Sequence, residues 1–324
     1  MEHLFECVPN ISEARDVAVL DAVERAIVTT GEAWLLDRSS DPDHARSVFT
    51  VAGSRTGTRA AMESLVEVSI ERIDLRRHRG QHPRIGAVDV VPFVPLGDTS
   101  MAECVALARA FAAQIAERHR LPVFLYGEAA LRSERRLLAT VRQPRFEGLA
   151  TAMAAPGGAP DFGPSQPHST AGATAVGARP FLIAYNIQLD SADIAVARRI
   201  AARVRERDGG LPAVQALGLA LESRGGVQVS MNILDHDRTP LWRVWEAVGA
   251  EAVADGVAVL GSELIGLAPL AALTAVADHI GSPPGRDLNE RLGEAATWLR
   301  IVGFRPDMAL ELRLAGAREG GAPR

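Results

Sequence analysis

Hydrophobic residues in the first third of the chain recur with two spacings, at every second position or at every third to fourth position. Short alternating or continuous apolar runs are typical of strands, and the longer spacing is typical of amphipathic helices. Their order predicts a strand, a helix, two strands, a helix and a strand, the split βαβ arrangement of ferredoxin-like folds. The predicted strands are residues 4–8, 33–37, 47–52 and 88–94, and the predicted helices are residues 12–31 and 57–73.

The same order returns in the second half of the chain. It follows a predicted helix at 101–118, a predicted strand at 122–126 and a stretch from 144 to 172 that lacks either spacing. A long irregular stretch inside a compact domain is usually functional or disordered. The elements predicted after it are strands at 181–189, 213–221, 227–234 and 257–260, and helices at 192–207 and 240–254.

The repeated order predicts an α+β protein with two ferredoxin-like (βαββαβ) subdomains. We assign residues 1–178 to the first subdomain and residues 179–314 to the second, packed with a ligand cleft between them, because domain interfaces favour pockets. The tail, residues 315–324, is rich in glycine and alanine and is predicted to be disordered.

The composition narrows the possible classes of function. With 47% hydrophobic and 23% charged residues, the 324-residue chain can bury substantial cores, which excludes a disordered protein. A net charge of -5 argues against a nucleic-acid-binding protein, which needs a surplus of basic residues. The sequence contains no lysine, so its 35 basic side chains are all arginines, and arginine enrichment alone carries little functional information.

Two further features concern the cellular compartment. No uncharged apolar run approaches the ~18 residues of a membrane span, and no charged-then-apolar leader opens the chain. Cys7 and Cys104 lie in apolar contexts and are expected to be buried free thiols. We therefore expect a cytoplasmic protein that binds neither membranes nor nucleic acids.

Residues 76–93, RRHRGQHPRIGAVDVVPF, place two histidines and four arginines directly before an apolar strand. Imidazoles change charge near neutral pH, and arginines bind carboxylates through paired hydrogen bonds. Three interpretations are open: a solvated basic turn, a metal site that uses His78 and His82, or one histidine that transfers protons. The third is favoured because it needs a single imidazole, whereas Gly80 and Pro83 oppose the helix that would place both histidines on one face.

Glycine occurs in two further stretches, DFGP at residues 161–164 and GATAVGAR at residues 172–179. Neither stretch matches a dinucleotide-binding fingerprint or a P-loop. Each is interpreted either as a surface loop or as backbone that closes around a flat ligand. Polar residues at the ends of the first strands, which either satisfy turn backbone or line a site, are Asn10, Asp37, Asp41 and Asp43.

Together these motifs resemble the formiminotransferase domain family, glutamate formimidoyltransferase, found alone in bacteria or fused to a cyclodeaminase in animals. The resemblance covers nearly the whole chain, and its most specific part is the RGxHPRxGAxD loop at residues 79–89. The other motifs that carry it are ECVPN at 6–10, LD at 36–37, YGEAA at 126–130, DFGP at 161–164, GAR at 177–179, FLIAYNI at 181–187, VSMNILD at 229–235 and GSELIGL at 261–267.

The resemblance implies a cytoplasmic homodimer of two α/β subdomains with a folate-binding cleft between them. The family transfers the formimino group of N-formimino-L-glutamate to N5 of tetrahydrofolate, a co-substrate, in histidine degradation, and no metal is implied. The family's catalytic histidine matches His82, the proposed general acid/base. Its folate-binding segment matches Gly163, Pro164, Ser165, Gln166, Pro167, His168, Ser169, Thr170, Ala171 and Gly172.

Both substrates of this family carry carboxylates, so Arg79, Arg84 and Arg179 are expected to bind them, with Asn10 and Ser39 as further substrate-binding residues.

The sequence departs from the family pattern at three positions. Ser39 replaces an acidic residue or histidine, Ala45 replaces asparagine, and Ala14 replaces glycine. A folate-binding paralogue with weak or lost turnover, or a transferase with another formimino or formyl donor, is therefore an alternative. A third is a metal-dependent hydrolase that uses His44, His78 and His82.

Overall fold

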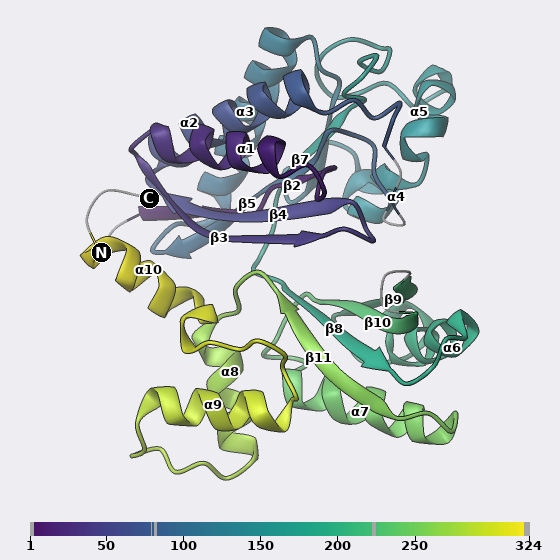
Figure 1. The fold of residues 1–324 in the computed structure, drawn as a ribbon. Helices are drawn as coiled ribbons and strands as arrows, with labels where there is room; N and C mark the ends of the chain where they lie inside the picture. Colours follow the sequence, from purple (N-terminus) through teal and green to yellow (C-terminus); the bar gives the residue numbers. More distant parts are fainter. Residues whose placement is uncertain (1–2, 79, 81–82, 222–224, 321–324) are drawn as a thin grey trace. The chain divides into compact units, whose positions relative to one another are not determined.

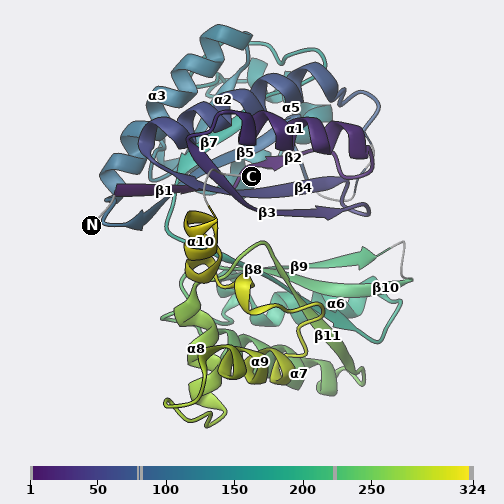
Figure 2. The same ribbon diagram turned by 60° about the vertical axis from the view of Figure 1, so that its left-hand side comes forward.

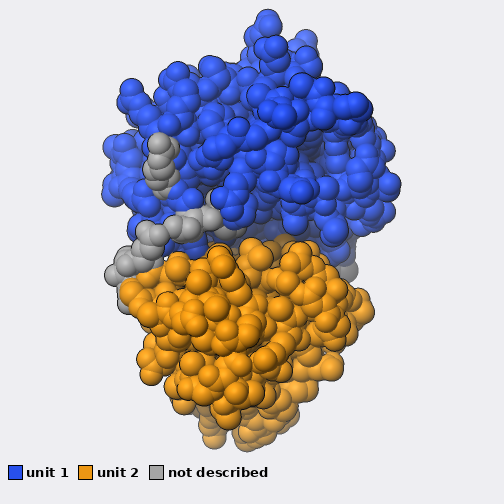
Figure 3. Space-filling view, turned by 90° about the vertical axis from the view of Figure 1, so that its right-hand side faces the viewer, with its two compact units in different colours: residues 1–180, 317–324 blue, residues 181–316 orange. Residues whose placement is uncertain are grey.

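The computed structural model describes residues 3–78, 80, 83–221 and 225–320. The chain divides into two compact units (Figure 3). The first comprises residues 1–180 and 317–324, and the second comprises residues 181–316. Each unit contains one β-sheet with helices, which confirms the predicted mixed α+β class.

The first unit contains seven strands, five α-helices and one 3-10 helix among its described residues. These are β1 (His3–Cys7), β2 (Asn10–Ile11), α1 (Val17–Thr29), β3 (Ala33–Asp41), β4 (Arg46–Gly53), α2 (Arg55–Arg72), β5 (Val88–Gly97), α3 (Met101–His119), β6 (Val123–Gly127), η1 (Ser133–Arg135), α4 (Leu138–Arg142), α5 (Arg145–Ala154) and β7 (Thr174–Ala178).

The strands of the first unit form one sheet (Figure 1). Strand β4 lies between β3 and the two short strands β1 and β2, both of which also pair with β5. On the other side of β5, β7 and then β6 extend the sheet in parallel, whereas the other pairs are antiparallel. The parallel addition places the ends of β5 and β7 next to each other.

Helices α1, α2 and α3 cover one face of this sheet (Figures 1 and 2). Each helix begins at a side chain that accepts backbone N–H groups, Asp16, Ser54 and Ser100 respectively. The core beneath them includes the edge-to-face pair Phe93 and Phe111, whose ring centroids are 5.5 Å apart. A smaller core on the opposite face is covered by α4 and α5.

Strand β5 contains an irregularity where it leaves the arginine-rich loop. Asn10 lies opposite Val90 and Ile11 lies opposite Val88, so Asp89 is an extra residue in the ladder. Val88 joins the core under α1 to α3, whereas Val90 joins the smaller core under α4 and α5. The bulge therefore changes which face the alternate side chains of β5 occupy.

The second unit has a four-stranded antiparallel sheet in the order β11-β8-β10-β9, with α6 and α7 packed against it. Its elements are β8 (Ile183–Leu189), α6 (Ile194–Val204), η2 (Glu206–Asp208), β9 (Val214–Leu221), β10 (Gly226–Ile233), α7 (Leu241–Ala254), β11 (Val259–Ile265), α8 (Leu270–His279), α9 (Leu288–Trp298) and η3 (Pro306–Met308), and helix α10 (Leu310–Glu319) begins in it. The predicted elements do not include α8, α9 and α10.

The structure corrects four local predictions. The first strand of the hairpin is longer than predicted: β3 continues through residues 38–41, and only residues 42–45 form the turn before Arg46. Helix α5 occupies part of the stretch 144–172 that was predicted to be irregular. Residues 174–178 form the buried strand β7 instead of a loop. Helix α10 continues to Glu319, so the start of the tail predicted to be disordered is helical.

Candidate active site

The arginine-rich loop is fixed by hydrogen bonds of His78 and Arg84. Arg84 Nε donates to His78 Nδ1 over 2.7 Å, and His78 Nε2 lies 3.0 Å from the carbonyl oxygen of Ala45. Because a guanidinium only donates, His78 Nδ1 must accept, and the imidazole proton must sit on Nε2 and point at that carbonyl. Burial and the charge of Arg84 lower the pKa of His78, against the hydrogen bond to Ala45. His78 is therefore held as a neutral ring.

Arg79 and His82, the predicted carboxylate-binding and catalytic residues, lie outside the described residues. Both ring nitrogens of His78 are already engaged, which opposes its use as a proton carrier or metal ligand. Among the described residues no group of three or more His, Cys, Asp or Glu side chains is placed to hold a metal ion.

The Arg84 guanidinium also forms a two-pronged ion pair. Its Nη1 and Nη2 donate to the two carboxylate oxygens of Glu147 on α5, at 3.2 and 2.8 Å. The Arg84 side chain is 8% exposed and the Glu147 side chain 62% exposed, so a buried cation is capped by a carboxylate at the surface. The hydrogen bond from Arg84 lowers the pKa of Glu147.

The loop and the predicted folate-binding segment are joined by backbone hydrogen bonds. Leu75 N donates to Thr170 O and Ala87 N donates to Ala171 O, each over 2.9 Å, and Ala173 N donates to Ile85 O over 3.0 Å. The structure thus brings together two motifs that lie about eighty residues apart in the sequence.

Two glycines permit this close pairing. A Cβ on Gly86 would lie 1.9 Å from the carbonyl oxygen of Ala173. Gly172 has φ +70°, and a Cβ there would lie 2.2 Å from the carbonyl oxygen of Ile85. Any larger residue at either position would separate the loop from the segment.

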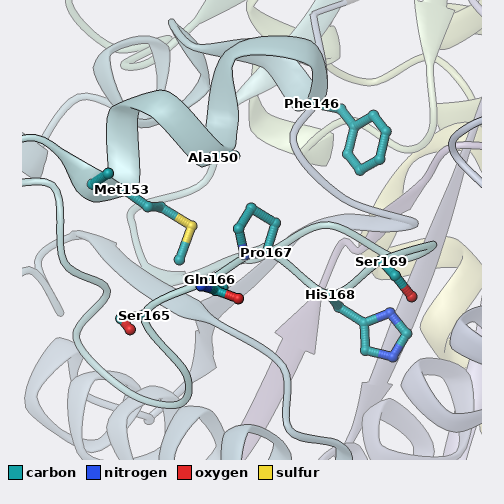
Figure 4. A pocket seen from close by; sticks show the side chains of 9 residues that line it. Phe146, Ala150, Met153, Ser165, Gln166, Pro167, His168 and Ser169 are labelled. Atoms are coloured by element: carbon teal, nitrogen blue, oxygen red, sulfur yellow. The ribbon is translucent and has the colours of Figure 1, made fainter.

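The same segment lines a hollow of about 650 Å³ (Figure 4). Helix α5 supplies the apolar wall, and the segment supplies a wall with hydroxyl, amide and imidazole groups. His168 Nδ1 accepts from the backbone N–H of Ala171 over 3.1 Å, which leaves the ring proton on Nε2. The lining residues are Phe146, Ala150, Met153, Ala154, Ser165, Gln166, Pro167, His168 and Ser169.

A buried ion pair supports the chain just before this segment. Asp161 Oδ2 accepts from Arg135 Nη1 and from the backbone N–H of Leu125, each over 2.8 Å. Arg135 also donates to the carbonyl oxygens of Gly157 and Ala159. The side chains of Arg135 and Asp161 are 8% and 3% exposed. The pair therefore fixes the course of the backbone that leads into Gly163 and Pro164.

A second group of charges surrounds the bulge of β5 and was missed by the sequence interpretation. Asp89 Oδ1 accepts from the backbone N–H of Ile85 over 2.8 Å, and its Oδ2 lies 2.5 Å from Arg142 Nη2. Burial and the positive charge of Arg142 lower the pKa of Arg46 to about 10, so Arg46 remains protonated at neutral pH. A crevice too narrow to hold a water molecule lies beside this group and is lined by Ser12, His44, Ala45, Arg46, Arg84 and Asp89.

Two predicted substrate-binding residues lie in one row across the sheet. Asn10 and Ser39 are both opposite Val48 of β4, on either side of that strand. Asn10 Nδ2 donates to the carbonyl oxygen of Val8 over 3.0 Å, and Ser39 Oγ donates to Asp37 Oδ2 over 2.9 Å. Because neighbouring strands are about 4.8 Å apart, these side chains lie within roughly 10 Å of each other.

Arg179, another predicted substrate-binding residue, is separated from the loop. Arg179 follows the last residue of β7, whereas Gly172 lies two residues before the first residue of that strand. The five residues of β7, roughly 16 Å in length, therefore lie between Arg179 and Gly172. Burial raises the pKa of Tyr126, and the charges of Arg179 and Arg142 act against this shift, which places both guanidiniums near the phenol.

The turn between β3 and β4 contains Ala45, one of the three departures from the family pattern. Ala45 has φ 48°, in the left-handed region that asparagine adopts more readily than alanine. Asp41 accepts from the backbone N–H groups of Asp43 and His44, and its Oδ2 lies 2.7 Å from His44 Nδ1. The Asp41 contacts hold the turn without the asparagine at position 45.

Fold and site together define an α+β protein in which an arginine- and histidine-rich loop is joined to a glycine-bounded segment beside a hollow. The chain belongs to the formiminotransferase family: the formiminotransferase domain, N-terminal subdomain, matches residues 4–179, and the formiminotransferase domain matches residues 184–284. The resemblance seen in the motifs is thereby confirmed.

Two relatives match over almost their whole length. Glutamate formimidoyltransferase of Streptococcus pyogenes serotype M1 is 43% identical over 279 residues, which is 86% of this chain and 93% of the relative. Glutamate formimidoyltransferase of Thermoplasma acidophilum is 42% identical over 300 residues, which is 90% of this chain and 98% of the relative. Formimidoyltransferase-cyclodeaminase of Rattus norvegicus is 41% identical over 84% of this chain but only 51% of its own length.

No helix formed by the described residues is both long enough and apolar enough to cross a membrane.

The Asp161→Asn variant tests the support of the predicted folate-binding segment. The substitution leaves the buried Arg135 without a counter-charge, so we expect a loss of about 3 kcal/mol in the free energy of unfolding, measured by urea denaturation. The control is Glu67→Gln, which breaks the exposed 2.8 Å pair between Glu67 and Arg118 and should cost less than about 1 kcal/mol. Equal losses in the two variants would contradict a special role for the buried pair.

The pH dependence of stability tests the turn at Asp41. Partial burial acts to raise the pKa of Asp41, but the hydrogen bonds from His44 dominate and lower it to about 2. A carboxyl group with a depressed folded-state pKa stabilises the fold above its unfolded pKa, and this contribution is lost as the pH falls through the folded value. We expect Asp41→Asn to be less stable than the wild type by about 1 kcal/mol at pH 6, because the carboxylate is partly exposed and solvent screens its contacts, with the difference shrinking between pH 4 and pH 2. A difference that does not change with pH would refute this account.

Proposed function

We propose that this protein is a glutamate formimidoyltransferase, which transfers the formimino group of N-formimino-L-glutamate to N5 of tetrahydrofolate in histidine degradation. Family membership and the two relatives that bear this name over nearly their full length support the proposal. The structural observation that supports it is the backbone pairing between residues 85–87 and 171–173, which belong to the motifs that we propose as catalytic loop and folate-binding segment.

The reaction requires two proton transfers at one carbon. The lone pair of N5 attacks the amidine carbon, and a tetrahedral intermediate forms with nitrogen on both sides. A base takes the proton from N5, and an acid gives a proton to the glutamate nitrogen as its bond to the carbon breaks. We propose that the imidazole of His82 performs both transfers in turn, which contributes about 10²- to 10⁴-fold to the rate.

The larger share of the acceleration is assigned to the positioning of both substrates. The hollow beside α5 offers an apolar wall for a flat ring, and the segment from Gly163 to Gly172 offers polar groups for the ring edge. We assign the binding of substrate carboxylates to Arg79, Arg84 and Arg179, with Asn10 and Ser39 as additional contacts. Among the described residues, Arg84 makes three hydrogen bonds to side chains, one to His78 and two to Glu147.

Features of the whole protein are part of the same proposal. We assign both units to the ferredoxin-like class, and the antiparallel order β11-β8-β10-β9 supports this assignment for the second unit. The family resemblance further supports a folate-binding cleft between the units, a homodimer and a cytoplasmic location. Light scattering of the purified protein measures the state of association directly.

The His82→Ala variant tests the catalytic assignment. With formiminoglutamate and tetrahydrofolate as substrates, the absorbance of 5-formiminotetrahydrofolate reports turnover. We expect kcat to fall at least about 100-fold, because the acid/base group is lost, while calorimetry shows tetrahydrofolate binding nearly unchanged.

The matched control is His3→Ala, since that side chain is 59% exposed on β1 and pairs only with Glu103 among the described residues. Unchanged turnover in the His82 variant would refute the assignment. Wild-type protein that binds tetrahydrofolate but turns over formiminoglycine or a formyl donor instead would identify a different donor, to which Ser39 and Ala45 point.

A further inference from the structure

The ion pair between Arg84 and Glu147 differs from the other surface ion pairs of the first unit. Its cation is buried and makes three hydrogen bonds to side chains, one to His78 and two to Glu147. In a typical exposed pair both groups are hydrated, and the interaction contributes little. Here the removal of the carboxylate would leave a buried guanidinium with no anionic partner on α5, which is strongly unfavourable.

The pair is the middle of a continuous chain of contacts. Glu147 accepts from Arg84, Arg84 donates to His78, and His78 donates to the carbonyl oxygen of Ala45 in the turn between β3 and β4. Glu147 therefore determines where the guanidinium sits, and the guanidinium determines the tautomer and orientation of the ring that attaches the loop to the turn.

The other end of the chain of contacts is the wall of the hollow. Phe146, next to Glu147, lines the hollow with Ala150 and Met153 of the same helix. Phe146 also lies against Gly172, the residue at which the segment pairs with the loop. Helix α5 thus contacts the proposed folate site with one side and the anchor of the proposed catalytic loop with the other.

We propose that Glu147 is a positioning residue for formimino transfer, which couples occupation of the hollow to the placement of the loop at residues 76–84. The inference rests on the proposed function. Glu147 does not touch the reacting atoms; it acts through Arg84 and His78.

The test compares Glu147→Ala with Glu147→Asp in the full-length protein. We expect Glu147→Ala to lower kcat by about 10- to 100-fold, because a displacement of about 1 Å in the loop is enough for such a loss, with the Kd for tetrahydrofolate within about threefold of the wild type. Glu147→Asp retains the carboxylate and should recover most of kcat. Circular dichroism melting confirms that each variant is folded.

Trypsin provides a readout that does not depend on turnover. Arg76 and Arg77 are 61% and 89% exposed in their side chains and are cleavage sites at the start of the loop. We expect cleavage there to be at least about threefold faster in Glu147→Ala than in the wild type, because the variant weakens the contacts of Arg84 and His78 that anchor the loop. Tetrahydrofolate should slow this cleavage in the wild type and in Glu147→Asp but not in Glu147→Ala.

The control is Glu67→Ala, which removes a carboxylate from an exposed pair on α2 and α3 with the same 2.8 Å separation. A kcat and a cleavage rate in Glu147→Ala within twofold of the control would overturn the proposal. Wild-type protein that shows no formimino transfer would refute the proposed function alone, since the difference in cleavage between Glu147→Ala and the wild type still tests the positioning role.

Discussion

The site depends on one set of backbone hydrogen bonds, those between the entry of β5 and the entry of β7. They join Ile85 and Ala87 to Ala171 and Ala173 at a spacing that leaves no room for a side chain at Gly86 or Gly172. Through this pairing the described end of the charged loop, the hollow and two parallel strands meet at one corner of the first unit. A substitution at either glycine would act on all three at once.

The charges of this corner are arranged so that buried arginines are compensated by a few well-placed carboxylates. Asp161 forms an ion pair with Arg135, Asp89 with Arg142, and Glu147 with Arg84. Guanidiniums suit such sites because they remain protonated and offer several directed donors. In a chain without lysine, the same residue type can hold the scaffold and meet substrate carboxylates, so the partners of each arginine decide its role.

The sequence allowed much of the fold and the position of the site to be predicted, but not the way in which its parts are joined. Amphipathic spacing located α1, α2 and α3, and the loop at 76–84 was identified from its composition. Strand β7 was missed because its run, TAVGA, is short and contains Gly177. Glu147 and Arg142 were missed because their partners lie far away in the sequence, and only the tertiary structure shows that Arg84 is already bound to a carboxylate. The placement of His82 was predicted from the family motif and remains a prediction.

The bulge at Asp89 gives β5 a further property. Residues two apart in a regular strand face the same side, but the extra residue places Val88 and Val90 on opposite faces of β5, in different cores. Deletion of Asp89 would make Val88 and Val90 direct neighbours, and direct neighbours lie on opposite faces of a strand, so both valines would keep their cores. The deletion would instead remove the Asp89 carboxylate, which accepts from the backbone N–H of Ile85 and pairs with Arg142, so the extra residue matters through its charge and not through the alternation of the strand.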